Sequence, residues 1–475
     1  MSNATSLPEG CAVGVEVPSS GNSSYSLALY LPSSWNNRFL AVGNAGYGGF
    51  TAWSDIGIYA HYGFAAVSTN TGHDGGFTTS DWALNKESLM DWGWRALHGS
   101  VVIGKDLVKS YYDQAATYSY YSSCSTGGRQ GLNEIEKFPD DFDGAFVGAP
   151  AWWLPHLGIW TSQATLANLP KNSSHHISST LASAITDEII RQCDPQDGVK
   201  DGIVMEPYSC RFDPNTLLCT PTSNTTNCLQ QPQMNTLYKA LNDWVDFDQT
   251  FIFPVPALGA SIGDFIGDDT EPASMGTGFI QHFILNTTND YDWSTFNYSL
   301  VKLAEEINPG EATPNDYDLR PFFNRGGKLI HWHGLADPVI PFGSSLYFYN
   351  QVKQALVPHG VDLDESYRFF PIAGMGHCSG SDKSPYYIAG GTQSLTGATH
   401  GVPGFEDAEH DGMLALMRWV ENGTAPERLV ATKYKDDSAS NGVQSQRPLC
   451  PYPLQAKYIS GEITKAESWE CKSLY

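Results

Sequence analysis

The sequence predicts an α/β fold with a mostly parallel sheet and a large insertion. In the first 150 residues, short apolar runs that suit strands alternate with a longer run of helical period. From about Ala151 to about Leu319 this alternation is lost, and the segment is rich in Asn, Asp, Thr, Trp and Pro. Regular strand patterns return after it. Because alternating strands and helices build parallel sheets, residues 1–150 and 321–475 are expected to form one domain, and residues 151–320 an inserted domain.

Short β-prone runs supply the expected strands, and two segments of helical period supply flanking helices. The strand runs are 26–31, 39–42, 64–68, 118–122, 327–332 and 367–371. The helical segments are 89–111 and 413–420, and Gly423 follows the second as a helix stop. No internal repeat or low-complexity tract interrupts this pattern.

Charge and hydropathy exclude several classes of protein. The 475 residues carry 27 Lys and Arg against 51 Asp and Glu, a formal net charge of −24, without any Lys/Arg cluster. Phosphate backbones are bound by basic patches, so nucleic acid is not an expected partner. No window approaches the roughly 18 to 20 uninterrupted apolar residues of a spanning helix, and the first residues lack the pattern of a signal peptide. A soluble chain without membrane contact is expected.

Sequons and cysteines nevertheless indicate secretion by a eukaryote. N-x-S/T sequons for glycosylation occur at Asn3, Asn22, Asn172, Asn224, Asn286, Asn297 and Asn422. The nine cysteines form no C-x2-C pair, and closely spaced ones are Cys193 and Cys210, Cys219 and Cys228, and Cys450 and Cys471. This spacing suits short disulfide loops better than zinc. Because nine is odd, one thiol is free, pairs between chains, or has lost its partner with an N-terminal segment. The absent signal peptide favours the last.

The candidate nucleophile is Ser125. The run 118–132 passes from a β-prone strand through a turn of small residues into a helix-prone stretch, with Ser125 at its apex. A strained strand-to-helix turn exposes a nucleophilic hydroxyl and tolerates only small neighbours such as Gly127. Compared with the pattern G-x-S-x-G, Ser123 replaces the first glycine and Gly127 retains the last. The alternative is a Ser/Gly turn without chemistry.

Partners for this serine follow two later strands. Asp337 lies in a loop beyond the strand at 327–332, where Pro338 stiffens the turn, and His377 lies in a Gly-rich loop after the strand at 367–371. Ser, Asp, His is the chain order of the α/β-hydrolase topology. The sequence therefore predicts an α/β-hydrolase fold with a catalytic triad, in preference to an unrelated histidine in a surface loop.

Two cysteines adjoin these candidates. Cys124 immediately precedes Ser125, and Cys378 immediately follows His377. If the serine hydroxyl and the imidazole are within hydrogen-bond reach, the neighbouring α-carbons can approach to the roughly 4.4 to 6.8 Å that a disulfide spans. A bridge between Cys124 and Cys378 would then hold the base beside the nucleophile. Two unrelated buried thiols are the alternative.

These residues resemble the Cys-Ser, Asp and His-Cys arrangement of the tannase and feruloyl esterase family, and the likeness covers nearly the whole chain. Similar segments are 43–46 (GNAG), 71–74 (TGHD), 127–131 (GGRQG), 138–144 (FPDDFDG) and 368–370 (RFF). Fungal type B feruloyl esterases look most similar. The resemblance implies an α/β-hydrolase domain with an inserted lid, acting on hydroxycinnamate or gallate esters. It also implies the triad Ser125, Asp337 and His377, and a Cys124–Cys378 bridge.

Two departures from the family pattern concern the N-terminal part. Relatives usually begin with a longer cysteine-containing stretch, so Cys11 is expected to lack its partner. Many relatives have Gly-Asn-Gly-Gly where this chain has Ala45, which affects the expected oxyanion geometry. By analogy with other hydrolases, Gly46 and the N–H of Thr126 are the candidates for the oxyanion hole.

The insertion contains a candidate calcium loop at 193–203. Its carboxylates and backbone carbonyls are the oxygen ligands that calcium prefers, and Gly198 and Gly202 allow the loop to curl, although it does not match an EF-hand. A solvated acidic turn is the alternative. The resemblance implies a structural calcium and a Cys193–Cys210 bridge that closes the loop. The implied ligands are Asp194, Asp197, Val199, Asp201 and Ile203, with Val199 and Ile203 acting through their carbonyls.

Other residues admit competing interpretations. His331 and His333 alternate on one strand and share a face, but no third ligand is near in sequence, so a catalytic metal is not expected there. His73 and His98 are interpreted as structural. Trp152, Trp153 and Trp160 either line an aromatic acyl pocket or pack the lid.

The function expected from the triad, the sequons and the cysteines is a secreted serine esterase, and the resemblance implies that it releases hydroxycinnamic acids from plant cell-wall esters. No redox or organic cofactor is implied. The main alternative is a tannase acting on galloyl esters, which is disfavoured because the lid has no adjacent basic pair for proteolytic processing. A related bacterial class cleaves terephthalate monoesters. A non-catalytic binding protein of the same fold is a further alternative, but such a protein needs no nucleophile.

Overall fold

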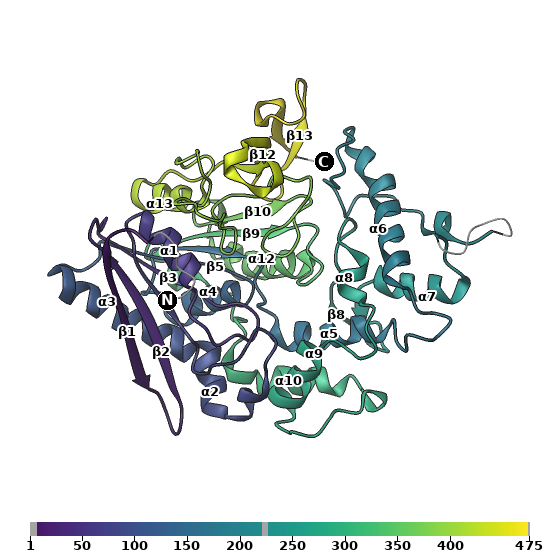
Figure 1. Cartoon of the computed structure of the whole chain (residues 1–475), viewed down its shortest axis with the longest axis horizontal. Helices are drawn as coiled ribbons and strands as arrows, with labels where there is room; N and C mark the ends of the chain where they lie inside the picture. The colour runs from purple at the N-terminus through teal and green to yellow at the C-terminus, as the bar shows by residue number, and fades with distance from the viewer. Residues whose placement is uncertain (1–6, 221–226, 474–475) are drawn as a thin grey trace.

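The computed structural model describes residues 7–220 and 227–473 and contains an eight-stranded mixed sheet (Figure 1). In spatial order its strands are β1 (Gly10–Pro18), β2 (Ser24–Pro32), β4 (Ala65–Thr69), β3 (Arg38–Val42), β5 (Tyr118–Cys124), β6 (Gly144–Gly148), β9 (Lys328–Gly334) and β10 (Tyr367–Ile372). The pairings β1–β2 and β2–β4 are antiparallel, and all the others in this sheet are parallel. The prediction of an α/β fold with a mostly parallel sheet is confirmed.

Helices cover both faces of the sheet, which explains why its central strands are buried throughout. One face packs against α3 (Ala96–Tyr112), α4 (Thr126–Lys137) and α12 (Phe342–Leu356). The opposite face packs against α1 (Trp53–His61) and α13 (Gly412–Asn422). Strands covered on both sides are largely apolar, and β3, β4 and β6 agree with this apart from Arg38 at the start of β3 and Ser68 and Thr69 at the end of β4. Because β5, β6, β9 and β10 pair in parallel, the carboxyl ends of β5, β9 and β10 lie at one edge of the sheet.

The helix expected at 89–111 is divided by a wider turn. It comprises α2 (Lys86–Met90), a π-helical turn at Asp91–Arg95, and α3. Asp91 is buried in this turn and accepts hydrogen bonds from Ser19, Ser23 and Arg95. The expected helix at 413–420 is α13, and Gly423 ends it in the left-handed region with φ 69°. Strands β1 and β6 were not expected from the sequence.

The segment between β6 and β9 adds no strand to the large sheet in the part of the chain that is described. Its helices are α5 (Leu154–Leu166), α6 (Ser179–Cys193), α7 (Gln231–Ala240), α8 (Ile262–Ile266), α9 (Ser274–Gly278), α10 (Ser299–Ile307) and α11 (Arg320–Asn324), with a hairpin of β7 (Trp244–Val245) and β8 (Phe251–Phe253). Helices α6, α7 and α8 lie beside the sheet, at the right of Figure 1. The core of this segment also includes Tyr47, Leu89 and Trp92, so the segment is packed firmly against the first part of the chain.

The C-terminal region forms two small antiparallel ribbons that the sequence did not predict. One pairs β11 (Leu429–Tyr434) with β12 (Val443–Leu449), and the other pairs β13 (Gln455–Tyr458) with β14 (Trp469–Lys472). A disulfide between Cys450, which directly follows β12, and Cys471 in β14 connects the two ribbons.

All the expected disulfides are present. They are Cys124–Cys378, Cys193–Cys210, Cys219–Cys228 and Cys450–Cys471. Cys11 is a free cysteine within the described residues and is partly exposed.

Of the sequon asparagines, Asn3 and Asn224 lie outside the described residues, and the other five are exposed. None of the helices within 7–220 and 227–473 is both long and apolar enough to cross a membrane.

Candidate active site

Ser125 lies at a sharp turn between β5 and α4. Its backbone has φ 64° and ψ −125°, which is unusual for a residue other than glycine. The turn is crowded: a Cβ added to Gly127 would lie 1.9 Å from Oγ of Ser123, and one added to Gly128 would lie 2.3 Å from the carbonyl oxygen of Gly148. Only glycine fits at these two positions. The glycines that follow Ser125 in the sequence are therefore required by steric crowding. The turn places the Ser125 hydroxyl at the carboxyl edge of the sheet.

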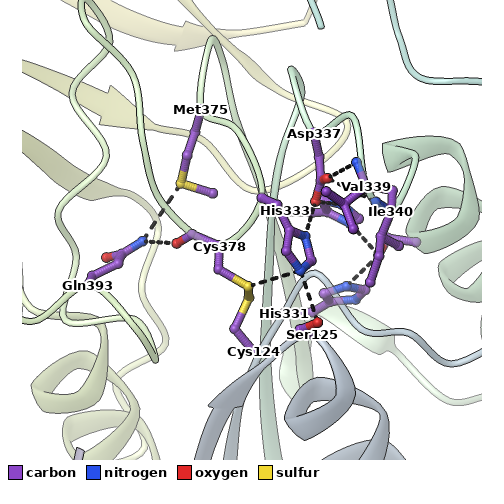
Figure 2. Close-up of polar contacts among 12 residues, drawn as sticks. Cys124, Ser125, His331, His333, Asp337, Val339, Ile340, Met375, Cys378 and Gln393 are labelled. Carbon is purple, nitrogen blue, oxygen red and sulfur yellow. Dashed lines mark hydrogen bonds and ion pairs between the residues drawn. A yellow bond between two sulfur atoms is a disulfide. The ribbon is translucent and has the colours of Figure 1, made fainter. Parts of the chain in front are cut away.

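His377 joins this hydroxyl to Asp337. Nε2 of His377 lies 2.9 Å from Oγ of Ser125, and Nδ1 of His377 lies 2.7 Å from Oδ2 of Asp337 (Figure 2). The structure thus brings together all three residues that the sequence analysis selected. Their loops follow β5, β9 and β10, whose carboxyl ends lie at the same sheet edge.

Asp337 is completely buried and receives four hydrogen bonds. Its Oδ1 accepts the backbone N–H groups of Val339 and Ile340, while Oδ2 lies within bonding distance of both His377 and His333. Burial alone would raise the pKa of Asp337, but the interactions with His377 and His333 outweigh it and hold that pKa below its ordinary value. The carboxylate is therefore ionised at neutral pH.

The disulfide Cys124–Cys378 connects the serine loop to the histidine loop. Its α-carbons are 6.0 Å apart, within the range expected from the sequence. The histidine loop is held again by Gln393, whose Nε2 donates to the carbonyl oxygen of Cys378 over 3.0 Å (Figure 2). The amide oxygen of Gln393 accepts from the N–H groups of Ile388 and Gly390.

The two candidates for the oxyanion hole are adjacent. Oγ1 of Thr126 donates a hydrogen bond of 2.8 Å to the carbonyl oxygen of Gly46. Thr126 is the first residue of α4, so its N–H is one of the helix N–H groups without an intrahelical acceptor. Gly46 has φ 57°, and a Cβ there would lie 2.5 Å from the carbonyl oxygen of Phe77. Ala45 is accommodated in this loop, where its carbonyl oxygen accepts from the N–H of Gly48.

A cleft of about 740 Å³ opens beside His377, between the inserted segment and the loops after β9 and β10. Ile190, Val204 and Leu258 form an apolar part of its wall. Its charged lining residues are Asp187, Asp264, Asp382 and Lys383.

The tryptophans considered for an acyl pocket lie elsewhere. Trp152 is buried in the core, and its Nε1 donates to the carbonyl oxygen of Ser344. Trp153 stacks on His156 and Tyr347. Trp160 packs against Phe253 and borders a separate cavity in the inserted segment. Packing is therefore the role that the structure supports for these three side chains.

The candidate calcium loop is closed by the Cys193–Cys210 disulfide, and Gly198 and Gly202 have φ angles of 94° and 79°. Oδ1 of Asp194, Asp197 and Asp201 accepts the N–H groups of Asp201, Val199 and Ile203, respectively. The donor set, carboxylates and carbonyls, suits calcium. However, Oδ2 of Asp201 is paired with Arg447 at 2.5 Å, so part of the negative charge is already compensated.

Within the described residues, one group of three His, Cys, Asp or Glu side chains has its ligand atoms within 4.8 Å of one another. It consists of His98, Glu134 and Asp141. The carboxylates of the loop at 193–203 do not meet this distance limit. In this group, Nδ1 of His98 lies 3.1 Å from Glu134 and 2.8 Å from Asp141, and the ring stacks on Phe138. His73 stacks on Trp82, with ring centroids 3.8 Å apart. Both histidines therefore have structural contacts.

His331 and His333 do share a face of β9, as expected, and both rings contact the hydroxyl of Ser345. Sequence reasoning did not select Ser345, nor Tyr367, which contacts His331. No local motif marks these two residues, because α12 and β10 bring them to β9 only in the folded protein.

Comparisons with known proteins agree with this geometry. The family model described as Tannase and feruloyl esterase matches residues 11–250 and 270–472. A probable feruloyl esterase B-1 of Aspergillus oryzae is 34% identical over 465 residues, which are 97% of this chain and 83% of that protein. The corresponding protein of Neosartorya fischeri is 35% identical over 474 residues, covering 99% of this chain and 87% of its own length.

Solved structures are similar over the same extent. A crystal structure of an esterase from Aspergillus oryzae has a TM-score of 0.90 at 31% identity and covers 98% of this chain and 90% of its own. A feruloyl esterase B from the same organism has a TM-score of 0.89 at 33% identity, covering 98% and 91%. These relationships make the chain a carboxylic ester hydrolase. It belongs to the tannase and feruloyl esterase family.

Proposed function

We propose that this protein is a secreted serine esterase that releases hydroxycinnamic acids such as ferulate, coumarate and caffeate from plant cell-wall esters. The observation that carries the proposal is the hydrogen-bonded series Ser125, His377 and Asp337, with contacts of 2.9 and 2.7 Å. The relatives named feruloyl esterase B support the choice of acyl group. The sheet order supports an α/β-hydrolase fold, and we assign residues 151–320 to its lid.

In the proposed mechanism, Nε2 of His377 takes the proton of Ser125 as Oγ attacks the ester carbonyl. Asp337 holds the Nδ1–H tautomer and stabilises the imidazolium that forms. His377 then protonates the leaving alcohol, and the acyl group remains on Ser125. Water attacks this acyl-enzyme with His377 again acting as base, which releases the acid and restores the serine.

The oxyanion formed in each step would be bound by the N–H groups of Thr126 and Gly46. The hydrogen bond between the Thr126 side chain and the Gly46 carbonyl holds the two peptides in a fixed relation before substrate arrives. Such preorganised donors typically contribute on the order of a hundredfold to a thousandfold in turnover.

The cleft beside His377 is the proposed substrate site. Ile190, Val204 and Leu258 offer an apolar surface for an aromatic ring, and Asp187 and Asp264 offer acceptors for phenolic hydroxyls. The cleft is continuous with the inserted segment, which supports a role for that segment in substrate selection.

We also propose that the loop at 193–203 binds a structural calcium ion through Asp194, Asp197, Asp201 and the carbonyls of Val199 and Ile203. Calcium would supply a rigid link between α6 and the loop that borders the cleft at Gly202 and Val204. Secretion is supported by four disulfides and by five exposed sequon asparagines, which are also proposed glycosylation sites.

The function is tested with a panel of methyl ferulate, methyl caffeate, methyl p-coumarate and methyl gallate, using the wild-type protein and Ser125→Ala. Wild-type turnover of the hydroxycinnamates, with at least a thousandfold loss in the variant, is expected. A preference for methyl gallate would identify a tannase instead. Inactivity on the whole panel would favour a binding protein, and an active Ser125→Ala variant would refute the nucleophile.

A further inference from the structure

A buried row of polar side chains extends from Asp337 away from the substrate cleft. Nε2 of His333 lies 3.1 Å from Oδ2 of Asp337, and Nδ1 of His333 lies 2.7 Å from Oγ of Ser345. Beyond Ser345, Nε2 of His331 follows at 2.8 Å, and Nδ1 of His331 lies 2.8 Å from the hydroxyl of Tyr367. All these side chains are 0% exposed except Tyr367, at 1%.

The chemistry of the neighbours determines where each proton lies. Nε2 of His333 faces two groups that can only accept, the Asp337 carboxylate and, at 2.9 Å, the carbonyl oxygen of Ile340. Nε2 must therefore carry a proton. In a neutral ring Nδ1 then accepts, so Ser345 donates to it. Ser345 in turn accepts from the Nε2–H of His331, and Nδ1 of His331 accepts from the Tyr367 hydroxyl.

A doubly protonated His333 would reverse this order and leave a donor unsatisfied. Ser345 would then donate to His331, and His331 would donate to Tyr367. Among the described residues, His331 is the hydrogen-bond partner found for the Tyr367 hydroxyl, whose proton would have no acceptor. An unsatisfied buried donor is unfavourable because it has given up its hydrogen bonds to water. Burial, followed by the proximity of His333, also lowers the pKa of His331 well below its ordinary value. The neutral arrangement satisfies every proton.

We propose that His333 is a positioning residue for the esterase reaction, a neutral Nε2–H donor that completes the hydrogen bonding of Asp337 and is itself oriented by Ser345, His331 and Tyr367. The inference rests on the proposed function, because it concerns the residue that orients His377. With the N–H groups of Val339 and Ile340, His333 leaves the carboxylate one direction in which to bind the catalytic imidazole.

Removal of the His333 donor has two consequences. The carboxylate gains freedom to rotate, so His377 is held less well for attack and kcat falls. The carboxylate also becomes a stronger acceptor for the remaining imidazole, which stabilises the protonated form of His377. The acid limb of kcat/KM, where His377 loses its proton, therefore moves to higher pH.

The experiment compares His333→Phe, which has no donor, with His333→Gln, whose amide can donate to Asp337. For His333→Phe we expect kcat to fall by about tenfold to a hundredfold, KM to change less than about twofold, and the acid limb to rise by roughly half a pH unit or more. His333→Gln should recover most of both effects. The charged residues around the cleft, Asp187, Asp264, Asp382 and Lys383, are the same in both variants, so the difference reports on position 333 alone.

An acid limb that is unchanged in a folded His333→Phe variant would overturn the proposal, as would a His333→Gln variant no better than His333→Phe. If His333→Phe does not fold, nitrogen-15 NMR of histidine-labelled wild-type protein provides the test. The histidine signal that is lost in the His333→Gln spectrum should be, in the wild type, that of a neutral ring with an Nε2–H tautomer. An imidazolium at position 333 would refute the inference. Wild-type turnover of the hydroxycinnamates, together with inactivity of Ser125→Ala, tests the proposed function separately.

Discussion

Sγ of Cys378 lies 3.7 Å from Nε2 of His377, so the disulfide to Cys124 touches the nitrogen that faces Ser125 (Figure 2). The bridge spans a sequence separation of 254 residues and joins the two loops that carry the nucleophile and the base. It therefore acts on the geometry of the active site as well as on the stability of the fold.

Replacement of Cys124 and Cys378 together by Ala is expected to reduce kcat/KM by about tenfold to a hundredfold, because a displacement of the imidazole by about 1 Å can have such an effect. KM should change less than kcat, since the cleft is lined by other residues. Steady-state kinetics on methyl ferulate measure the change.

The matched control is the double variant Cys450→Ala/Cys471→Ala, which removes the disulfide that connects the two C-terminal ribbons. This control should lower the melting temperature and leave kcat of the remaining folded enzyme unchanged. If both double variants lose stability and activity in the same proportion, the active-site disulfide has no special role in positioning.

Arg129 is expected to be essential for the stability of the fold. It is completely buried and donates to the carbonyl oxygens of Trp92, Gly93 and Ala312. It thus ties α4 to the π-helical turn and to the end of the inserted segment. Burial lowers the pKa of Arg129 to about 9. Arg129→Met removes these donors, and we expect a loss of about 2–4 kcal/mol in the free energy of unfolding, measured by urea denaturation.

Arg129→Lys should be nearly as damaging, because an ammonium group cannot reproduce the fork of guanidinium donors. The control is Arg428→Met, which removes an exposed arginine paired with Glu409 and should change stability by less than about 0.5 kcal/mol. If Arg129→Met and Arg428→Met change the free energy of unfolding equally, the buried donors of Arg129 contribute nothing to stability.

Stability is expected to decline as the pH rises, because of the cluster at His98 and Glu134. Burial raises the pKa of Glu134 to about 8, while its ordinary value is 4.5. Burial would lower the pKa of His98, but hydrogen bonds to Asp141 and Glu134 raise it to about 9 from 6.5. Both folded-state values exceed the unfolded ones, so their stabilisation is complete below pH 4.5 and is lost progressively up to about pH 9.

The measurement is the melting temperature from pH 4.5 to 9 for the wild type and for Glu134→Gln. The glutamine keeps the shape and cannot ionise, so the decline between pH 4.5 and 8 should be shallower in the variant. If the melting temperatures of the wild type and the variant fall in parallel with pH, Glu134 is not responsible for the pH dependence of stability.

The sequence was sufficient to select the triad because each of its members lies in a local pattern. Small residues around Ser125 follow from the crowding at Gly127 and Gly128, and Asp337 and His377 lie in the loops that follow β9 and β10. The disulfide followed from two cysteines adjacent to residues already selected. Strand β10 was expected at 367–371 and ends one residue later, at Ile372; most of its residues are apolar, and Gly374 follows it.

Other features depend on contacts that no local pattern records. Strand β6 has only the five residues Gly144–Gly148, two of them glycine, and it becomes a strand because it lies between β5 and β9. Ser345 is 12 residues from His333, and Tyr367 is 36 residues from His331. Their alignment behind Asp337 depends on the packing of α12 and β10 against β9. The inserted segment likewise shows no periodic pattern, and its core includes Tyr47, Leu89 and Trp92 from the first part of the chain.

Removal of calcium is expected to destabilise the protein if the loop at 193–203 binds it as proposed. A ligand at a hundred times its Kd stabilises the folded protein by about 2.7 kcal/mol. Excess EDTA should therefore lower the melting temperature by at least about 3 °C, and calcium, but not magnesium, should restore it.

In the double variant Asp194→Asn/Asp197→Asn the melting temperature should not respond to EDTA. Arg447 already pairs with Asp201, so this variant leaves that ion pair intact and serves as an internal control for folding of the loop. A wild-type melting curve that is identical in metal-free and calcium-containing buffers would contradict the site, and would mean that Arg447 alone compensates the charge of the loop.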